Sequence, residues 1–546
     1  MSKSLFFFLS FVLSTGLVFS QKNSAPKLVV GVVVDQMMVD YLYRYESRFS
    51  KGGFLKLMNK GTNCRNTQYN YVPTYTGPGH ASIYTGSTPS ESGIISNSWY
   101  DREAGASVNC VTDSNYFSVG TESSSGIRSP HYLKCMTITD QLKATYTNSK
   151  VISISIKDRG AILPGGHMSD GSYWYDYVTG RMITSEFFMN ELPHYVKNFN
   201  QLGKPAVAMK TTWNTLYPIE TYTASGPDDS PYEMIFRSKK TPTFPYNFAQ
   251  ITDSVGPYSY FTSTPMANTF LTDFALSCMK NENLGRADHT DFLAISYSTP
   301  DIAGHAFGPY AVEMEDMYLR LDLEIERLMK ALKKQVGNDF VIFLTADHAV
   351  VPVPQWLIDN KLPGGYAFLD QKLIDLSEEI VNKFGADFLV KEENDQIYLD
   401  DELMEFMGVD KDEIELFTAH QISKWGGVKY VYTTKDMHRS SGADGLTEMI
   451  RNGFDPKRSG NVIFVLESGY LSKSADTEAS RKGTSHGSAY NYDTHVPLLW
   501  YGKNIGKKQV YERIEIIDIV PTLSQILNLQ NPSCTMGIPI LPVLTK

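Results

Sequence analysis

Short apolar runs, rich in β-branched residues, recur along the chain, and polar residues follow each of them. The runs cover residues 28–34, 151–156, 292–298, 340–345, 462–466 and 496–500. They are apolar at nearly every position rather than at alternate positions, which is typical of strands buried on both faces of a sheet. The pattern therefore predicts a central sheet that is mainly parallel.

Amphipathic helices are expected between these strands. In residues 313–334, apolar side chains recur at spacings of three and four, at Met314, Met317, Leu321, Ile325, Leu328 and Leu332. Such a stripe faces a hydrophobic core. Strands that alternate with helices predict an α/β fold in which helices sandwich the sheet.

Two stretches interrupt this alternation. Residues 165–285 are rich in Tyr, Pro, Thr and Ser, and residues 355–450 carry short charged segments. We expect both to be insertions over the active-site edge of one domain, residues 21–546, where they would shape substrate choice. For much of the second stretch, a surface excursion without function is the alternative.

The N-terminus has the pattern of a secretory signal peptide. Lys3 precedes an apolar run from Leu5 to Phe19, and small residues surround Ser20. Residues 1–20 are therefore predicted to be removed, and the protein to be periplasmic or secreted; an uncleaved anchor is the alternative. No second apolar stretch is long enough to span a bilayer, so we expect no stable membrane anchor.

Composition narrows the possible partners. The 546 residues are 42% hydrophobic, enough for a large core, and the formal net charge is -10 without a basic run. This disfavours nucleic acid as the main partner, and we expect a monomer. Five cysteines leave disulfide pairing open, and the absence of a C-x-x-C pair argues against a cysteine zinc knuckle.

Chemically capable side chains follow the predicted strands. They are Asp35, Lys157, Arg159, Asp301, Asp347 and His348. One Asp after a strand is usually a helix cap, but capping alone does not explain so many. Because the carboxyl ends of parallel strands meet at one edge of a sheet, we expect these side chains to converge there.

Several of these residues have the chemistry of metal ligands. Asp301 and His305 are four positions apart, Asp347 and His348 are adjacent, and Asp35 and His486 complete three carboxylates and three imidazoles. This mixture of oxygen and nitrogen donors suits zinc, with manganese or iron as alternatives. It predicts a site for two metal ions.

Thr76 has the position of a nucleophile. It precedes Gly77 and Pro78 at the predicted start of a helix, where the helix dipole favours an anionic oxygen or a bound phosphate. Taken alone, a Thr before Gly-Pro is more often a turn residue or a helix N-cap.

Together these motifs resemble those of the alkaline phosphatase superfamily, in particular its threonine-nucleophile branch. That branch includes nucleotide pyrophosphatase/phosphodiesterases and phosphate-irrepressible bacterial alkaline phosphatases. The matching pieces are Val34-Asp35, Thr76-x-Pro78-x-His80, Thr85-Gly86, Ser92-Gly93-Ile94 with Asn97, Pro300-Asp301-x-x-Gly304-His305, Ala346-Asp347-His348, His486-Gly487 and Asp493-x-His495-Val496-Pro497. Arylsulfatases share the frame, but Thr76 and His80 depart from their pattern and disfavour sulfatase activity.

The resemblance implies roles for individual residues. One zinc ion would be held by Asp301, His305 and His486, and the other by Asp35, Asp347, His348 and Thr76. Phosphate would be clamped by Asn97, Lys157 and Arg159. If residues 157–159 continue a strand, Lys157 and Arg159 point the same way, and two cations aimed at the metals favour a monoester dianion; a salt bridge with Asp158 is the alternative. His80 and His495 are interpreted as structural.

The resemblance therefore implies an alkaline phosphatase that hydrolyses phosphate monoesters through a phosphothreonine. One alternative is a phosphodiesterase or nucleotide pyrophosphatase that uses the same metals. Another is an exported metal-binding module without catalysis, although the presence of Thr76 and all six ligands argues against it. A mutase or a phosphonate hydrolase is a third alternative.

Overall fold

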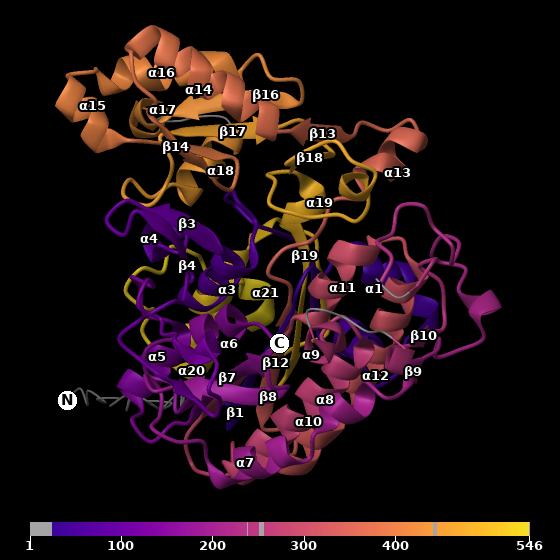
Figure 1. Cartoon of the computed structure of the whole chain (residues 1–546). Coiled ribbons are helices and arrows are strands. Elements are labelled where there is room, and N and C mark those ends of the chain that lie inside the picture. The colour runs from indigo at the N-terminus through magenta and orange to yellow at the C-terminus, as the bar shows by residue number, and fades with distance from the viewer. Residues whose placement is uncertain (1–23, 237–238, 251–255, 440–444, 545–546) are drawn as a thin grey trace, which may run out of the picture.

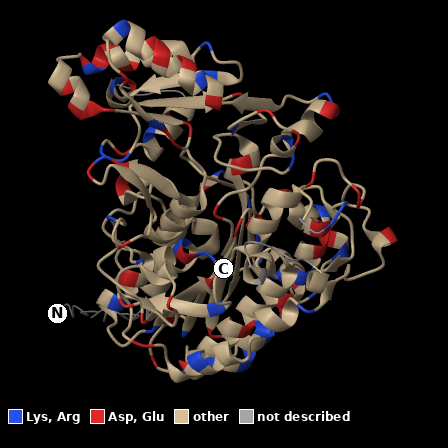
Figure 2. Ribbon diagram, in the orientation of Figure 1, with Lys and Arg blue, Asp and Glu red and all other residues tan. Residues whose placement is uncertain are grey.

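The structure is a computed structural model that describes residues 24–236, 239–250, 256–439 and 445–544. The predicted signal peptide, residues 1–20, lies outside the described residues. In the described part of the chain, no helix is long and apolar enough to cross a membrane. Along the ribbon, basic and acidic residues are interspersed (Figure 2).

The largest sheet within the described residues has eleven strands (Figure 1). In order across the sheet they are β20 (Lys508–Val510), β2 (Thr62–Gln68), β19 (His495–Gly502), β12 (Phe340–Thr345), β1 (Leu28–Val34), β11 (Asp291–Tyr297), β6 (Val151–Ser155), β7 (Gly171–Asp176), β8 (Arg181–Ser185) and β5 (Ser118–Val119), and β21 (Ile514–Glu515) pairs with β2. Strands β12, β1, β11, β6 and β7 are parallel, whereas β19 is antiparallel to both of its neighbours. The sheet is thus mixed but mostly parallel, as predicted.

Burial explains why the apolar runs become central strands. Every residue of β1, β11 and β12 is buried. Figure 1 shows α3 (Thr76–Thr85), α6 (Asp158–Gly165) and α20 (Ile519–Leu527) on one side of the sheet. On the other side lie α10 (Pro265–Asn281), α11 (Thr299–Phe307) and α12 (Val312–Val336). The predicted sandwich of helices is confirmed.

A second lobe, at the top of Figure 1, has its own sheet and its own hydrophobic core. Its strands, in order, are β14 (Leu389–Glu392), β15 (Gln396–Leu399), β17 (Val462–Leu466) and β16 (Val428–Thr433), covered by α14 (Asp370–Phe384), α15 (Asp401–Met407) and α16 (Lys411–Ile422). The expectation that residues 462–466 form a strand of the central sheet is therefore wrong. An apolar run encodes burial, but it does not encode which strand will be its neighbour.

The predicted insertion at 165–285 also differs from expectation. Strands β7 and β8 extend the central sheet, and α10 packs against α12. These segments belong to the body built around the central sheet rather than to a cover over its edge. The aromatic residues of β7, Gly171–Asp176, are buried, so this composition marks a buried strand.

The structure also assigns the cysteines. Cys135 and Cys534 form a disulfide across 399 positions of sequence. Cys64, Cys110 and Cys278 are free and buried. The sequence had left this pairing open.

Candidate two-metal active site

The carboxyl edge of the central sheet gathers the predicted ligands. They are Asp35 directly after β1, Asp301 and His305 on α11, Asp347 and His348 after β12, and His486 in the loop before α19 (Asn491–Thr494). Their ligand atoms form two groups of three, and within each group these atoms lie within 4.8 Å of one another. These groups match the two ligand sets that the resemblance implied.

The first triad consists of Asp301, His305 and His486. The Nε2 atoms of His305 and His486 lie 3.2 and 3.4 Å from Asp301 Oδ1. Asp301 and His486 are buried, whereas the ring of His305 is partly exposed. The site therefore opens towards solvent beside His305.

The second triad, Asp35, Asp347 and His348, is fully buried. His348 Nε2 lies 3.4 Å from Asp35 Oδ1 and 3.8 Å from Asp347 Oδ1. The ring of His348 stacks on that of His486 with 3.5 Å between centroids. The two triads are thus direct neighbours.

Backbone carbonyls orient all three imidazoles. Each Nδ1 lies 2.8–3.0 Å from a carbonyl oxygen and donates to it. The acceptors are Thr484 for His305, Thr74 for His486 and Ala349 for His348. A proton on Nδ1 leaves the Nε2 lone pair free to bind a metal.

The buried carboxylates fit a bound cation. The three carboxylates of Asp35, Asp301 and Asp347 are buried, and Asp35 Oδ1 has no hydrogen bond, which is a costly arrangement unless positive charge compensates. Lys157 Nζ lies 2.7 Å from Asp35 Oδ2 and 2.5 Å from Asp301 Oδ2. One ammonium serves both triads, and the nitrogen and oxygen donors suit zinc.

The electrostatics of the triads are set by burial and by neighbouring charges. Burial and the adjacent His348 lower the pKa of His486 to about 3, so this ring is neutral. Burial opposes a charge on His348, but Asp347 and Asp35 outweigh it and raise its pKa to about 9. Burial likewise opposes ionisation of Asp301, yet His305 and Lys157 hold its pKa well below the usual range.

Thr76 lies beside the second triad. It is the first residue of α3, with Oγ1 3.5 Å from His348 Nε2, and Lys157 Nζ donates to Oγ1 at 3.2 Å. Gly77 N–H donates to Asn97 Oδ1 at 2.7 Å. This bond orients Asn97 and leaves its amide NH2 to donate elsewhere.

The predicted strand alternation of Lys157 and Arg159 is wrong. Strand β6 ends at Ser155, Lys157 is the N-cap of α6, and Arg159 lies in the first turn of that helix. Arg159 Nη1 lies 3.5 Å from Asp158 Oδ1, the salt bridge weighed as an alternative. Asp158 favours a helix start because its charge complements the helix dipole.

The shortest contacts of His80 and His495 are with groups outside the two triads. His80 lies 2.9 Å from the Thr76 carbonyl and 2.8 Å from Ser296 Oγ. His80 Nδ1 is also 3.3 Å from Asp347 Oδ2. His495 Nε2 lies 2.9 Å from the Arg65 carbonyl. These contacts suit the structural roles expected of both residues.

Sequence reasoning assigned no role to Gln36. Its side-chain Nε2 donates to Asp301 Oδ1 at 2.7 Å, and its backbone N–H donates to Asp347 Oδ1 at 3.2 Å. The one available signal was its position directly after Asp35, at the end of a predicted central strand.

Comparison with known proteins agrees with this geometry. Residues 29–489 match a family described as type I phosphodiesterase / nucleotide pyrophosphatase. Alkaline phosphatase PhoV of Synechococcus elongatus is 41% identical, over 95% of this chain and 93% of its own. A Myroides odoratus protein named calcium-transporting ATPase is 42% identical, over 95% of each chain.

Alkaline phosphatase PafA of Elizabethkingia meningoseptica is 39% identical over 97% of each chain. A crystal structure of wild-type PafA superposes with a TM-score of 0.90 at 40% identity and covers 95% of this chain and 99% of its own. The likeness thus extends over nearly the whole chain in both sequence and structure.

Proposed function

The chain belongs to the type I phosphodiesterase / nucleotide pyrophosphatase family, and from this membership we propose that Thr76 is its nucleophile and that its two metal ions are zinc. The protein is an alkaline phosphatase, as its full-length similarity to PhoV and PafA indicates. Its substrates are phosphate monoesters. The position of Thr76 Oγ1, 3.5 Å from His348 Nε2 of the second triad and 3.2 Å from Lys157 Nζ, carries the assignment of the nucleophile.

Zinc is favoured by the donors. Asp301, His305 and His486 would hold one ion, and Asp35, Asp347, His348 and Thr76 the other. When bound, the ions supply Lewis acidity that lowers the pKa of a coordinated hydroxyl and stabilises negative charge on the departing oxygen. Three imidazoles among the ligands favour zinc over cations that prefer oxygen ligands.

Thr76 forms and then breaks the bond to phosphorus. Its Oγ1 gives up its proton to solvent and attacks phosphorus while the bond from phosphorus to the ester oxygen breaks, which leaves phosphothreonine and an alkoxide or phenoxide that takes up a proton from solvent. Water then attacks phosphorus, Oγ1 leaves, and inorganic phosphate is released. Lys157 Nζ holds Oγ1, and the start of α3 favours the negative charge that develops there.

A phosphate monoester dianion needs more charge stabilisation than a diester. We assign this task to Asn97, Lys157 and Arg159, which would donate to the non-bridging oxygens. Asn97 suits the role because Gly77 N–H occupies its carbonyl oxygen. Arg159 retains a buried Nε without a hydrogen-bond partner, so it has a donor left for a ligand.

Replacement of the nucleophile tests the proposal. We expect Thr76→Ala to lower kcat/KM for p-nitrophenyl phosphate by roughly 10⁴-fold or more, because the covalent step loses its acceptor. Thr76→Ser, which keeps a hydroxyl, should retain much more activity. Unchanged activity in Thr76→Ala would show that Thr76 is not the nucleophile, and metal analysis of both variants checks that the ions are kept.

We also propose that the protein is exported and monomeric. The signal-peptide pattern of residues 1–20 supports export to the periplasm or beyond. N-terminal sequencing of the full chain expressed in a Gram-negative host should find Gln21 first. Recovery of uncleaved protein in the membrane fraction would support the anchor instead, and light scattering of the purified protein tests the monomer.

A further inference from the structure

Gln36 connects the two triads. Through its side chain it donates to Asp301 of the first triad, and through its backbone N–H to Asp347 of the second. It follows Asp35, another member of the second triad. One residue thus contacts carboxylates that belong to different metal positions.

The backbone and the side chain of Gln36 are both in energetically unfavourable arrangements. Its φ is +63°, in the left-handed region that non-glycine residues seldom occupy. Its side-chain Oε1 is buried without a hydrogen bond. Features of this kind persist only where the surrounding structure requires them, and they concentrate at functional sites.

Gly304 provides the space for the Gln36 amide. A Cβ added at Gly304 would lie 1.9 Å from Gln36 Oε1 and 3.0 Å from Gln36 Cδ, and no other residue approaches it more closely. Gly304 lies on α11 between Asp301 and His305. The Asp301-x-x-Gly304-His305 motif therefore requires glycine at position 304, because any side chain there would collide with the Gln36 amide that reaches Asp301.

We propose that Gln36 is a positioning residue that sets the spacing of the two triads, with its amide holding Asp301 and its backbone N–H holding Asp347. The inference rests on the two-metal site proposed above. A hydrogen bond from outside the ligand set orients a carboxylate, and its loss typically lowers metal affinity 10- to 100-fold. The amide contact should therefore govern how firmly the Asp301 triad retains its ion.

Gln36→Gly separates the two contacts. Glycine keeps the backbone N–H and accepts a positive φ, but it removes the amide. We expect zinc retention against a chelator to fall roughly 10- to 100-fold for one of the two ions, and kcat for p-nitrophenyl phosphate to fall with it. The melting temperature of the zinc-saturated enzyme should not decrease, which separates positioning from a general structural role.

Lys361→Gly is a matched control. Lys361 also has a positive φ, +60°, and is exposed, so glycine relieves its backbone without touching the triads. It should leave zinc retention at the wild-type level. Equal loss in both variants, or wild-type retention in Gln36→Gly, would overturn the proposal.

Gly304→Ala supplies a second, independent test. Alone, its methyl group should displace the Gln36 amide and lower zinc retention. In the Gln36→Gly background the methyl group has room, so alanine should cause little further loss. Losses that multiply instead of saturating would show that the residues act separately and would contradict the proposal.

Metal analysis of the wild-type enzyme distinguishes failure of the proposed role of Gln36 from failure of the proposed two-metal function. Two zinc ions per wild-type chain with equal retention in Gln36→Gly would refute the role of Gln36 and leave the proposed function standing. A fully active wild-type enzyme without metal would overturn both.

Discussion

Asp158 lies between two arginines at the edge of the active site. Arg128 Nε donates to its Oδ2 at 2.8 Å, and Arg159 Nη1 is 3.5 Å from its Oδ1. The contact of Asp158 with Arg159 is the longer of the two, and Arg159 Nε has no hydrogen-bond partner. The Arg159 guanidinium can therefore still donate a hydrogen bond to a phosphoryl oxygen. Arg128 has no such free capacity at Nε.

We therefore predict that Arg159→Ala lowers kcat/KM for an aryl phosphate monoester roughly 10- to 100-fold, because one charge-assisted hydrogen bond is lost. A bis-aryl diester should lose less, since it carries less charge. Arg128→Ala is the matched control and should preserve the monoester-to-diester ratio. A ratio that stays constant in Arg159→Ala would show that Arg159 does not discriminate between monoester and diester.

Helix α3 is held at the end opposite Thr76 by the C-terminal segment. Thr535 Oγ1 donates to the Thr85 carbonyl at 3.0 Å, and Met536 N–H donates to the Gly86 carbonyl at 2.8 Å. The neighbouring Cys534 ties this segment to Cys135. The disulfide thus secures the segment that caps α3.

Replacing both cysteines by serine should lower the free energy of unfolding by about 2–4 kcal/mol, because the unfolded chain regains conformational freedom. Denaturant unfolding measures this change. Dithiothreitol should shift wild-type unfolding in the same direction and leave the double variant unaffected. If reduction leaves wild-type stability unchanged, this bond does not secure the segment.

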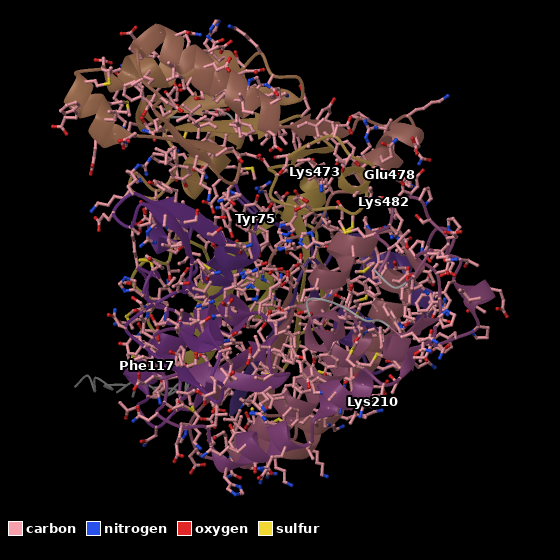
Figure 3. The ribbon with its side chains drawn as sticks, viewed as in Figure 1. Tyr75, Phe117, Lys210, Lys473, Glu478 and Lys482 are labelled. Carbon is pink, nitrogen blue, oxygen red and sulfur yellow. A yellow bond between two sulfur atoms is a disulfide. The ribbon has the colours of Figure 1, made fainter. Side chains whose placement is uncertain are left out.

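At the scale of the whole molecule, the second lobe and the body built around the central sheet line a pocket of about 270 Å³. Glu392 and Asp395 line it from the lobe, and Tyr75 and Asp493 from the body. Tyr75, the residue before Thr76, lies below the lobe in Figure 3. Burial, followed by the charge of Asp395, raises the pKa of Glu392 to about 7.

This shift predicts a pH-dependent stability. The folded-state pKa of Glu392 lies above the ordinary value of 4.5, so its contribution is fully present below pH 4.5 and is lost as pH rises through about 7. Glu392→Gln should therefore stabilise the protein by about 1–3 kcal/mol more at pH 9 than at pH 5. Melting curves at both pH values measure this, with the exposed Glu379→Gln as control; equal effects at both pH values would contradict the prediction.

The local pattern of the sequence was sufficient for the core elements and for the identity of the predicted ligands. Strands β1, β11 and β12 are mostly apolar and are buried throughout, and Asp35, Asp301 and Asp347 follow them closely. Parallel neighbours end at one edge, so convergence of these carboxylates could be inferred without coordinates.

Only the tertiary structure decided the rest. It placed residues 462–466 in the lobe, turned Lys157 and Arg159 into the start of α6, and paired Cys135 with Cys534. It also brought Gln36 to carboxylates 265 and 311 positions away. An apolar run or a polar side chain carries its own preference for burial or hydrogen bonding, but its partner depends on how distant segments pack.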